Sequence, residues 1–226
     1  MKPRAIIFDA YGTLFDVHSV VHRARNTRAD LVLLSTAWRQ KQIEYTWRRA
    51  LMKRYADFWQ VTGEALRAAA EKLQIKLSQA EFDSLMEAYL APDAYADART
   101  GLDSLRKYPL VILSNGSSAM LDSAVRANRF ETYFSRILSV DAIETYKPAP
   151  EVYALGTGAL GLSADEILFV SSNARDVAGA KAFGYPTCWC NRSGEPEDCI
   201  GFAPDVISTG LDQIANILSR SNRESG

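Results

Sequence analysis

Residues 5–8 read Ala-Ile-Ile-Phe, a short run without a polar side chain that ends at Asp9 and is followed by a turn at Gly12. A wholly apolar run of this length predicts a strand that is buried on both faces. Such strands lie at the centre of parallel sheets that helices cover on both sides. Because α/β folds gather their chemistry at the carboxyl ends of these strands, Asp9 stands where a functional group is expected.

Similar apolar runs return in the second half of the chain, with helical patterns between them. The predicted strands are residues 110–113, 137–140, 167–170 and 186–190, and the clearest helical segments are residues 118–129 and 177–183. Strands that alternate with helices predict an α/β fold, with a mostly parallel sheet and right-handed crossovers.

The stretch between residues 17 and 95 has a different sequence pattern, in which strand-like runs are absent and helical spacing of apolar residues dominates. Ile43, Trp47 and Leu51 recur every four residues, as on one face of a helix. We interpret this stretch as a helical insertion that covers the core. The predicted organisation is a core domain of residues 1–16 and 96–226 and a helical cap domain of residues 17–95.

The composition of the 226 residues is that of an ordinary soluble globular protein, with 47% hydrophobic and 23% charged residues. A net charge of -1 gives no electrostatic reason to expect nucleic acid or an anionic membrane as partner. Asp9 interrupts the first apolar stretch too early for a membrane span. The odd set of cysteines, Cys188, Cys190 and Cys199, does not suit a disulfide framework, so a reducing cytoplasm is the expected location.

Polar and ionisable side chains follow three of the predicted strands. They are Asp9 and Thr13 after the first strand, Ser114 and Asn115 after the second, and Ser171, Asn173 and Asp176 after the run at 167–170. Parallel strands bring their carboxyl ends to one edge of the sheet, so these groups are expected to meet there. A carboxylate in that position can act as a nucleophile, and a cation from Lys147 would keep it ionised and attract an anionic substrate.

Each of these residues also has an ordinary structural explanation. An Asp after a strand often caps a turn or helix, and Ser114 and Ser171 are typical turn residues. Lys147, which precedes Pro148, would usually be a solvated loop lysine. It is their ordered occurrence along one chain that favours a catalytic site.

Four motifs carry a resemblance to a known family. They are Asp9-Ala-Tyr-Gly-Thr-Leu-Phe-Asp16, Leu113-Ser-Asn-Gly116, Tyr146-Lys-Pro148 and Phe169-Val-Ser-Ser-Asn-Ala-Arg-Asp176. Together they resemble the haloacid dehalogenase superfamily, which implies a Rossmann-like core with a cap inserted after the first motif. The segments Trp38–Trp47 and Phe15–Ser19 are similar, more narrowly, to the L-2-haloacid dehalogenases.

The resemblance implies a reaction. The carboxylate of Asp9 would displace halide from a short L-2-haloacid, and water would then hydrolyse the resulting ester to a D-2-hydroxyacid. Arg39 and Asn115 would hold the departing halide by hydrogen bonds. Neither a cofactor nor a metal is implied, and members of this family are expected to form homodimers.

The resemblance also implies roles for the remaining residues of the motifs. Ser114, together with Thr13 and Lys147, would bind the substrate carboxylate, and Asn173 and Asp176 would position or activate the hydrolytic water.

Four further residues complete the expected pocket. Tyr11, Phe58 and Tyr153 would line it, and Ser171 is placed on its substrate-binding side. Arg175 departs from the family pattern, because a bulky aromatic residue that walls the halide site is expected in its place. This departure bears on the substrate range and the rate more than on the type of reaction.

Two other functions compete with this interpretation. A magnesium-dependent phosphatase of the same superfamily would carry a second Asp two residues after the nucleophile, where this chain has Tyr11. It would also tend to carry an acidic pair for Mg²⁺ after the last catalytic strand, where this chain has a single Asp176. A non-catalytic descendant would have lost the nucleophile, whereas Asp9, Arg39 and Lys147 are all retained.

Three other patterns have simpler explanations than a binding site. Residues 156–161 match G-x-G-x-x-G but follow a helical run, so we interpret them as a helix end rather than a dinucleotide site. His18 and His22 lack an evident third metal ligand. Cys188 and Cys190 flank Trp189 as strand neighbours do and are expected to pack. The aromatic stripe of the insertion is interpreted as core or dimer surface.

Overall fold

The computed structural model describes residues 2–23, 29–198 and 200–223. Its centre is a six-stranded sheet with the order β5-β4-β1-β6-β7-β8, in which every neighbouring pair is parallel. The strands are β1 (Ala5–Phe8), β4 (Leu110–Ser114), β5 (Phe134–Ser139), β6 (Ile167–Ser171), β7 (Thr187–Cys190) and β8 (Val206–Ser208). The predicted α/β class is therefore confirmed.

The apolar runs became the inner strands because their side chains can be buried on both faces. Every residue of β1 has an exposed fraction of 0%. Two strands run one residue further than predicted, since Ser114 and Ser171 still pair with neighbouring strands. The strand predicted at residues 137–140 is β5, which begins three residues earlier, at Phe134. An edge strand tolerates polar residues, and these interrupt the apolar pattern at its start. The same reason explains why β8, a short edge strand, was missed.

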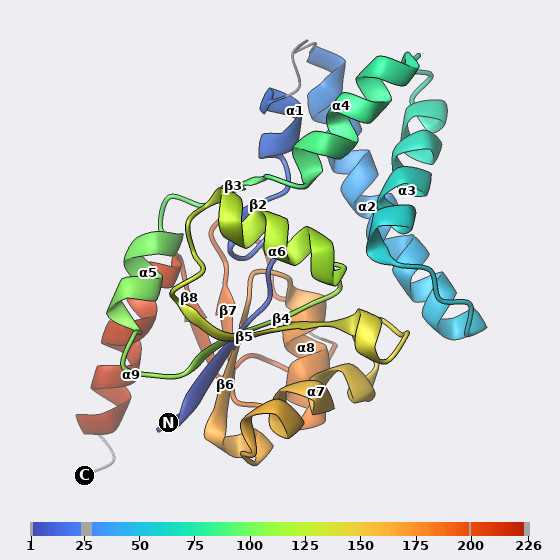
Figure 1. Ribbon diagram of the computed structural model, residues 1–226. Coiled ribbons are helices and arrows are strands. Elements are labelled where there is room, and N and C mark those ends of the chain that lie inside the picture. Colours follow the sequence, from blue (N-terminus) through green and yellow to red (C-terminus); the bar gives the residue numbers. More distant parts are fainter. Residues whose placement is uncertain (1, 24–28, 199, 224–226) are drawn as a thin grey trace.

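Helices cover both faces of this sheet (Figure 1). In that view α5 (Ala98–Ser104) and α9 (Ile214–Arg223) lie together on one side, and α7 (Pro150–Leu160) and α8 (Ala174–Phe183) lie together on the other. A further helix, α6 (Ser118–Ala127), packs against β5. From β1 the chain adds β4 and β5 on one side and then β6, β7 and β8 on the other, so the strand order reverses at β1. α/β proteins bind ligands in the loops at the carboxyl ends of the strands next to such a reversal.

The G-x-G-x-x-G match ends α7, as predicted, but only its last glycine caps the helix. Gly156 and Gly158 are helical, and only Gly161 ends the helix, with a left-handed φ of 64°. Gly156 is needed for packing, because a Cβ atom there would collide with Ile7 and with the hydroxyl of Tyr185, which would lie only 2.6 Å away.

The helices between residues 17 and 92 form a separate group at one end of the sheet (Figure 1). These cap helices are α1 (Ser19–Arg23), α2 (Ala29–Met52), α3 (Phe58–Lys72) and α4 (Gln79–Tyr89). The chain leaves and returns through β2 (Phe15–Asp16) and β3 (Asp93–Ala94), a short antiparallel pair that has no strand pattern in the sequence. The division into a core and a cap domain at residues 16/17 and 95/96 stays a prediction, and the part of it at residues 24–28 lies outside the described residues.

Buried hydrogen bonds hold the cap helices together. The indole N–H of Trp38 donates to the carbonyl oxygen of Thr62 over 2.8 Å, and the amide of Gln42 donates to the Thr62 hydroxyl over 3.0 Å. The hydroxyl of Tyr89 donates to Gln42 over 3.0 Å. Because these polar groups are satisfied where water is excluded, they hold α2, α3 and α4 in one arrangement.

The predicted stripe on α2 does not form one continuous buried face. Trp38 is buried, whereas Leu51 and Met52, at the end of the helix, are 85% and 58% exposed. The ring of His18 forms a hydrogen bond with the Ser35 hydroxyl. The thiols of Cys188 and Cys190 are buried, as expected for residues that pack in the core. The expectation for Cys199 lies outside the described residues. No helix within the described ranges has the length and apolar character needed to cross a membrane.

Candidate active site

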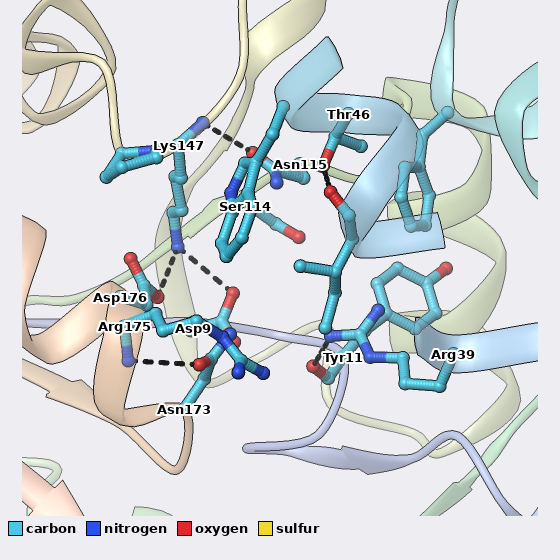
Figure 2. Close-up of a pocket in the computed structure, with 14 residues that line it drawn as sticks. Asp9, Tyr11, Arg39, Thr46, Ser114, Asn115, Lys147, Asn173, Arg175 and Asp176 are labelled. Carbon is cyan, nitrogen blue, oxygen red and sulfur yellow. Dashed lines mark hydrogen bonds and ion pairs between the residues drawn. The ribbon is translucent and has the colours of Figure 1, made fainter. Parts of the chain in front are cut away.

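A small pocket lies where the carboxyl ends of β1, β4 and β6 meet the cap helices. Its volume is about 40 Å³, room for only a few water-sized groups. Its lining comes from the sheet, from α8 and from α2 and α3 (Figure 2). The lining residues are Asp9, Tyr11, Arg39, Ile43, Thr46, Trp47, Phe58, Ser114, Asn115, Lys147, Pro148, Asn173, Arg175 and Asp176.

A buried lysine bridges two buried carboxylates at the base of this pocket. Figure 2 shows Nζ of Lys147 donating to Oδ1 of Asp9 over 3.0 Å and to Oδ2 of Asp176 over 2.9 Å. All three side chains are at most 10% exposed. The groups come from the end of β1, from the loop before α7 and from the first turn of α8, so the parallel sheet brings together residues that are far apart in sequence.

The charges of this cluster depend on one another. Burial lowers the pKa of Lys147, but the carboxylates of Asp176 and Asp9 outweigh it and raise that pKa above its ordinary value. Burial raises the pKa of Asp176, while Lys147 opposes the shift and Asp9 adds to it. Two carboxylates share a single buried ammonium, so Lys147 remains charged and Asp176 has more basic character than an exposed Asp.

Both oxygens of the Asp9 carboxylate are held. Lys147 binds Oδ1, and the Thr13 hydroxyl donates to Oδ2 over 3.2 Å. The same hydroxyl accepts a hydrogen bond of 2.9 Å from the backbone N–H of Ser172. Thr13 is fully buried and lies beneath Asp9 rather than on the pocket wall. These bonds restrict rotation of the carboxylate and fix the direction in which its lone pairs point.

The end of β4 contributes a hydroxyl and an amide. The Ser114 oxygen accepts from the backbone N–H of Gly116 over 3.1 Å, and its hydroxyl lies at the pocket. Asn115 accepts from the backbone N–H of Lys147 over 3.0 Å. This bond uses the amide oxygen, and no hydrogen bond within the described residues uses the Asn115 amide N–H groups, which remain donors for a bound molecule.

The turn after β6 brings Asn173 to the pocket and leaves Ser171 buried behind it. Asn173 caps α8, since its side-chain oxygen accepts from the backbone N–H of Arg175 over 3.1 Å. The Ser171 hydroxyl accepts from the backbone N–H of Asn173 over 3.1 Å. Ser171 is fully buried and does not line the pocket, so it supports the turn instead of facing a ligand there.

Tyr153 lies behind the pocket, contrary to the expectation that it would line it. Its hydroxyl donates to Oδ1 of Asp176 over 2.9 Å, whereas Lys147 donates to Oδ2 of the same carboxylate. Its ring packs edge-on against Phe169 with 5.6 Å between ring centroids. The difference arises because α7 turns this residue toward the sheet and α8. Tyr153 therefore orients Asp176 and does not touch the space in which a ligand would sit.

The opposite wall comes from the cap helices. Arg39 donates to the carbonyl oxygen of Tyr11 over 3.0 Å and reaches the pocket from α2 (Figure 2). Phe58, at the start of α3, packs on the Tyr11 ring with 6.1 Å between centroids. The Tyr11 hydroxyl is buried and has no hydrogen-bond partner within the described residues. Burial also raises the pKa of this phenol, so it is a poor proton donor.

Four lining residues were not predicted, namely Ile43, Thr46, Trp47 and Pro148. The first three follow Arg39 on the same helix by four, seven and eight residues, a spacing that places them on one face. That spacing was a usable signal once Arg39 had been placed in the site. Arg175 lines the same pocket, and its guanidinium lies 5.7 Å from the centre of the Trp47 ring.

The charged groups of the pocket match an anionic ligand. The pair of carboxylates exceeds the single ammonium of Lys147 by one negative charge, and the guanidinium groups of Arg39 and Arg175 add two positive charges. Three or more His, Cys, Asp or Glu side chains that could hold a metal ion do not occur together within the described residues. The arrangement can therefore hold a small anion against the Asp9 carboxylate.

Comparison with known proteins gives consistent findings. The model of the haloacid dehalogenase-like hydrolase family matches residues 3–184. The chain is 45% identical to (S)-2-haloacid dehalogenase 4A of Burkholderia cepacia over 89% of this chain and 88% of the relative. It is 43% identical to the (S)-2-haloacid dehalogenase of Pseudomonas sp. strain YL, with 95% and 94% covered. A structure of the L-2-haloacid dehalogenase from Xanthobacter autotrophicus with chloropropionic acid covalently bound superposes with a TM-score of 0.88, at 36% identity over 96% of this chain and 98% of that one.

Proposed function

Because the chain belongs to the haloacid dehalogenase-like hydrolases, and within them to the (S)-2-haloacid dehalogenases, we propose that it hydrolyses short L-2-haloacids to D-2-hydroxyacids through an ester formed on Asp9. It is thus a hydrolase that acts on carbon–halide bonds. The observation that carries the proposal is the Asp9 carboxylate at the base of the pocket, with each oxygen hydrogen-bonded and a guanidinium on the opposite wall.

In the first step one oxygen of Asp9 attacks C2 of the substrate from the side opposite the halogen. A C–O bond forms, the carbon–halogen bond breaks with its electron pair, and halide leaves. The configuration at C2 inverts. Lys147 and Thr13 orient the nucleophile, and the small size of the pocket, with Tyr11 and Phe58 on its wall, excludes water that would otherwise solvate the carboxylate.

Separate groups of the pocket bind the carboxylate and the halogen of the substrate. The Ser114 hydroxyl binds the substrate carboxylate beside Lys147. Arg39 and the free N–H groups of Asn115 bind the halogen as negative charge develops on it. Interactions that strengthen as the charge develops lower the barrier, because they are stronger in the transition state than in the bound substrate.

In the second step water attacks the carbonyl carbon of the Asp9 ester. The bond between that carbonyl carbon and the ester oxygen breaks, so the oxygen that came from Asp9 stays on C2 of the product. It takes up a proton to become the new hydroxyl group, and the oxygen of the water completes the Asp9 carboxylate. Asp176 accepts the proton of the attacking water, supported by its raised pKa and by the hydrogen bond from Tyr153. Asn173, the residue that caps the N-terminus of α8, positions this water.

No observation favours the phosphatase alternative. A phosphatase needs an acid for its leaving alkoxide, and the buried, partnerless phenol of Tyr11 within the described residues is a poor substitute. Halide departs without a proton, so the proposed reaction does not need one there. Strict dependence on Mg²⁺ together with release of phosphate from small esters would favour the phosphatase instead.

We extend the proposal to the setting of the enzyme. The exposed apolar side chains of Leu51 and Met52 on α2 support assembly as a homodimer, which light scattering would test. The buried thiols of Cys188 and Cys190 are compatible with a cytoplasmic location. No nucleic acid or membrane partner is proposed.

The test is halide release from each enantiomer of 2-chloropropionate in the presence of EDTA. We expect release from the L form alone, with D-lactate as the organic product. A single turnover in water enriched in ¹⁸O should then place the label in the Asp9 carboxylate and not in the first molecule of product. Label in the product of that first turnover would exclude the ester, and no halide from either enantiomer would exclude the reaction.

A further inference from the structure

Arg192, just beyond the end of β7, makes an unusually complete set of hydrogen bonds for a residue outside the pocket. Nε and Nη2 bind the carboxylate of Asp97 at 3.0 Å, and Nη1 donates to the Ser172 hydroxyl over 2.9 Å. Nη2 also donates to the carbonyl oxygen of Thr13 over 2.9 Å. The guanidinium lies 4.0 Å from the centre of the Tyr95 ring. Its side chain is only 20% exposed.

Two of these acceptors surround the Thr13 hydroxyl. Arg192 binds the backbone carbonyl of Thr13 itself, and it binds the side chain of Ser172, whose backbone N–H donates to the Thr13 hydroxyl over 2.9 Å. That hydroxyl in turn donates to Oδ2 of Asp9. Arg192 is therefore separated from the Asp9 carboxylate by one residue, Thr13, along the first route and by two residues, Ser172 and Thr13, along the second.

The remaining contacts reach the connection between the sheet and the cap helices. Tyr95 and Asp97 directly follow β3, on the segment by which the chain returns from the cap helices. The backbone N–H of Tyr95 bonds to the carbonyl oxygen of Leu14, on the segment by which the chain leaves. Arg192 thus contacts the return segment and the loop after Asp9 simultaneously.

We propose that Arg192 is a positioning residue for the reaction, which holds the Thr13 hydroxyl in line with Oδ2 of Asp9 and joins that alignment to the segments that carry the cap helices. The inference rests on the proposed role of Asp9 as nucleophile. Displacement at carbon requires the attacking oxygen to lie in line with the leaving group, so a small rotation of the carboxylate lowers the rate strongly without removing any group that touches substrate.

A purely structural role would have a different signature. The pair with Asp97 is partly exposed, and a pair of this kind would contribute to folding without affecting turnover of the folded enzyme. The two variants Arg192→Met and Arg192→Lys separate these roles. Met retains much of the stem over Tyr95 but none of the hydrogen bonds. Lys retains a charge for Asp97 but lacks the planar fork needed to reach Ser172 and Thr13 together.

The experiment measures halide release from L-2-chloropropionate, first by the unmodified enzyme and then by both variants. For Arg192→Met we expect kcat to fall about 10- to 100-fold, with KM changed by less than about 2-fold. For Arg192→Lys we expect thermal stability to recover toward the unmodified value while kcat stays low. Arg99→Met is the matched control, because Arg99 also lies over a ring and bonds to a backbone carbonyl but is far from Thr13 in the hydrogen-bond network.

A double-mutant cycle with Thr13→Val adds a second criterion. If Arg192 acts through the Thr13 hydroxyl, the loss in kcat for the double variant is close to that of the larger single variant instead of the product of both. Unchanged kcat in Arg192→Met, full recovery of kcat in Arg192→Lys, or multiplicative losses would overturn the inference. Those outcomes leave the proposed reaction intact, whereas absence of halide release by the unmodified enzyme refutes the reaction itself.

Discussion

The two walls of the pocket are built in opposite ways. On the sheet side, Asp9, Lys147 and Asp176 are buried and bound to one another, so each charged group has a fixed partner. On the helical side, Arg39 has one hydrogen bond to the backbone of Tyr11, and Trp47 is 37% exposed. Buried, mutually bonded charges are rigid, whereas single contacts at a partly open wall are adjustable. The sheet wall is thus suited to the chemical step and the helical wall to selecting what enters.

The largest expected effect lies on the sheet wall. Asp9→Asn removes the negative charge that attacks carbon while retaining the size of the side chain, so halide release should fall by about 10⁴-fold or more. Its thermal unfolding should remain cooperative. The exposed Asp122 on α6 offers a matched control, and Asp122→Asn should release halide at the unmodified rate. Normal turnover in Asp9→Asn would contradict the proposed nucleophile.

Removal of the shared ammonium should destabilise the fold in a manner that depends on pH. Lys147→Met leaves Asp9 and Asp176 buried without their cation, which should cost about 3–5 kcal/mol of unfolding free energy at pH 8. The pKa of Asp176 is already raised by burial and should rise further without Lys147. For a carboxyl whose pKa is raised on folding, stability is present below its unfolded pKa and is lost as the pH rises through its folded pKa.

The difference in unfolding free energy between Lys147→Met and the unmodified protein should therefore shrink as the pH is lowered from 8 toward 5. Urea unfolding at several pH values measures this difference, in which contributions of groups common to both proteins cancel. A difference that is constant over this range would show that Asp176 does not take up a proton when its cation is lost.

A smaller effect is expected on the helical wall. Arg39→Gln removes a positive charge from the halide side, and kcat/KM for L-2-chloropropionate should fall about 10- to 100-fold. Because Arg39 binds the backbone carbonyl of Tyr11 and not a carboxylate there, stability should change by less than about 1 kcal/mol. Arg48→Gln, on the exposed side of the same helix, should leave both quantities unchanged. An unchanged rate in Arg39→Gln would remove Arg39 from its proposed role.

The smallest effect is expected at the rim, where Arg175 lies over Trp47. Arg175→Phe replaces the cation by the aromatic ring that the family resemblance predicts for this place. We expect the ratio of kcat/KM for L-2-chloropropionate to that for chloroacetate to change by less than about 10-fold. These substrates differ by one methylene group, whose full contribution in an apolar pocket is about 1–3 kcal/mol, and a substitution at the rim alters only part of it. If this ratio and the rate are both unaffected, Arg175 does not contact bound substrate.

The sequence alone predicted the elements that depend on local pattern. The apolar run before Asp9 predicted a buried strand, because its side chains must avoid water. The four-residue spacing on α2 predicted a helix, although Trp47 and Leu51 on that stripe are exposed. The order of the strand ends indicated that Asp9, Lys147 and Asp176 would meet, and the structure places them within hydrogen-bond distance. The roles assigned to them stay predictions.

Only the tertiary structure decided which of these residues face the pocket. It places Tyr153 behind Asp176, turns Ser171 into a support of its own loop, and brings Trp47 to the rim beside Arg175. It also brings Arg192 to the backbone of Thr13, although 179 positions separate them. These placements depend on how α2, α7 and the end of β7 pack against distant parts of the chain, and no local pattern of polarity contains that information.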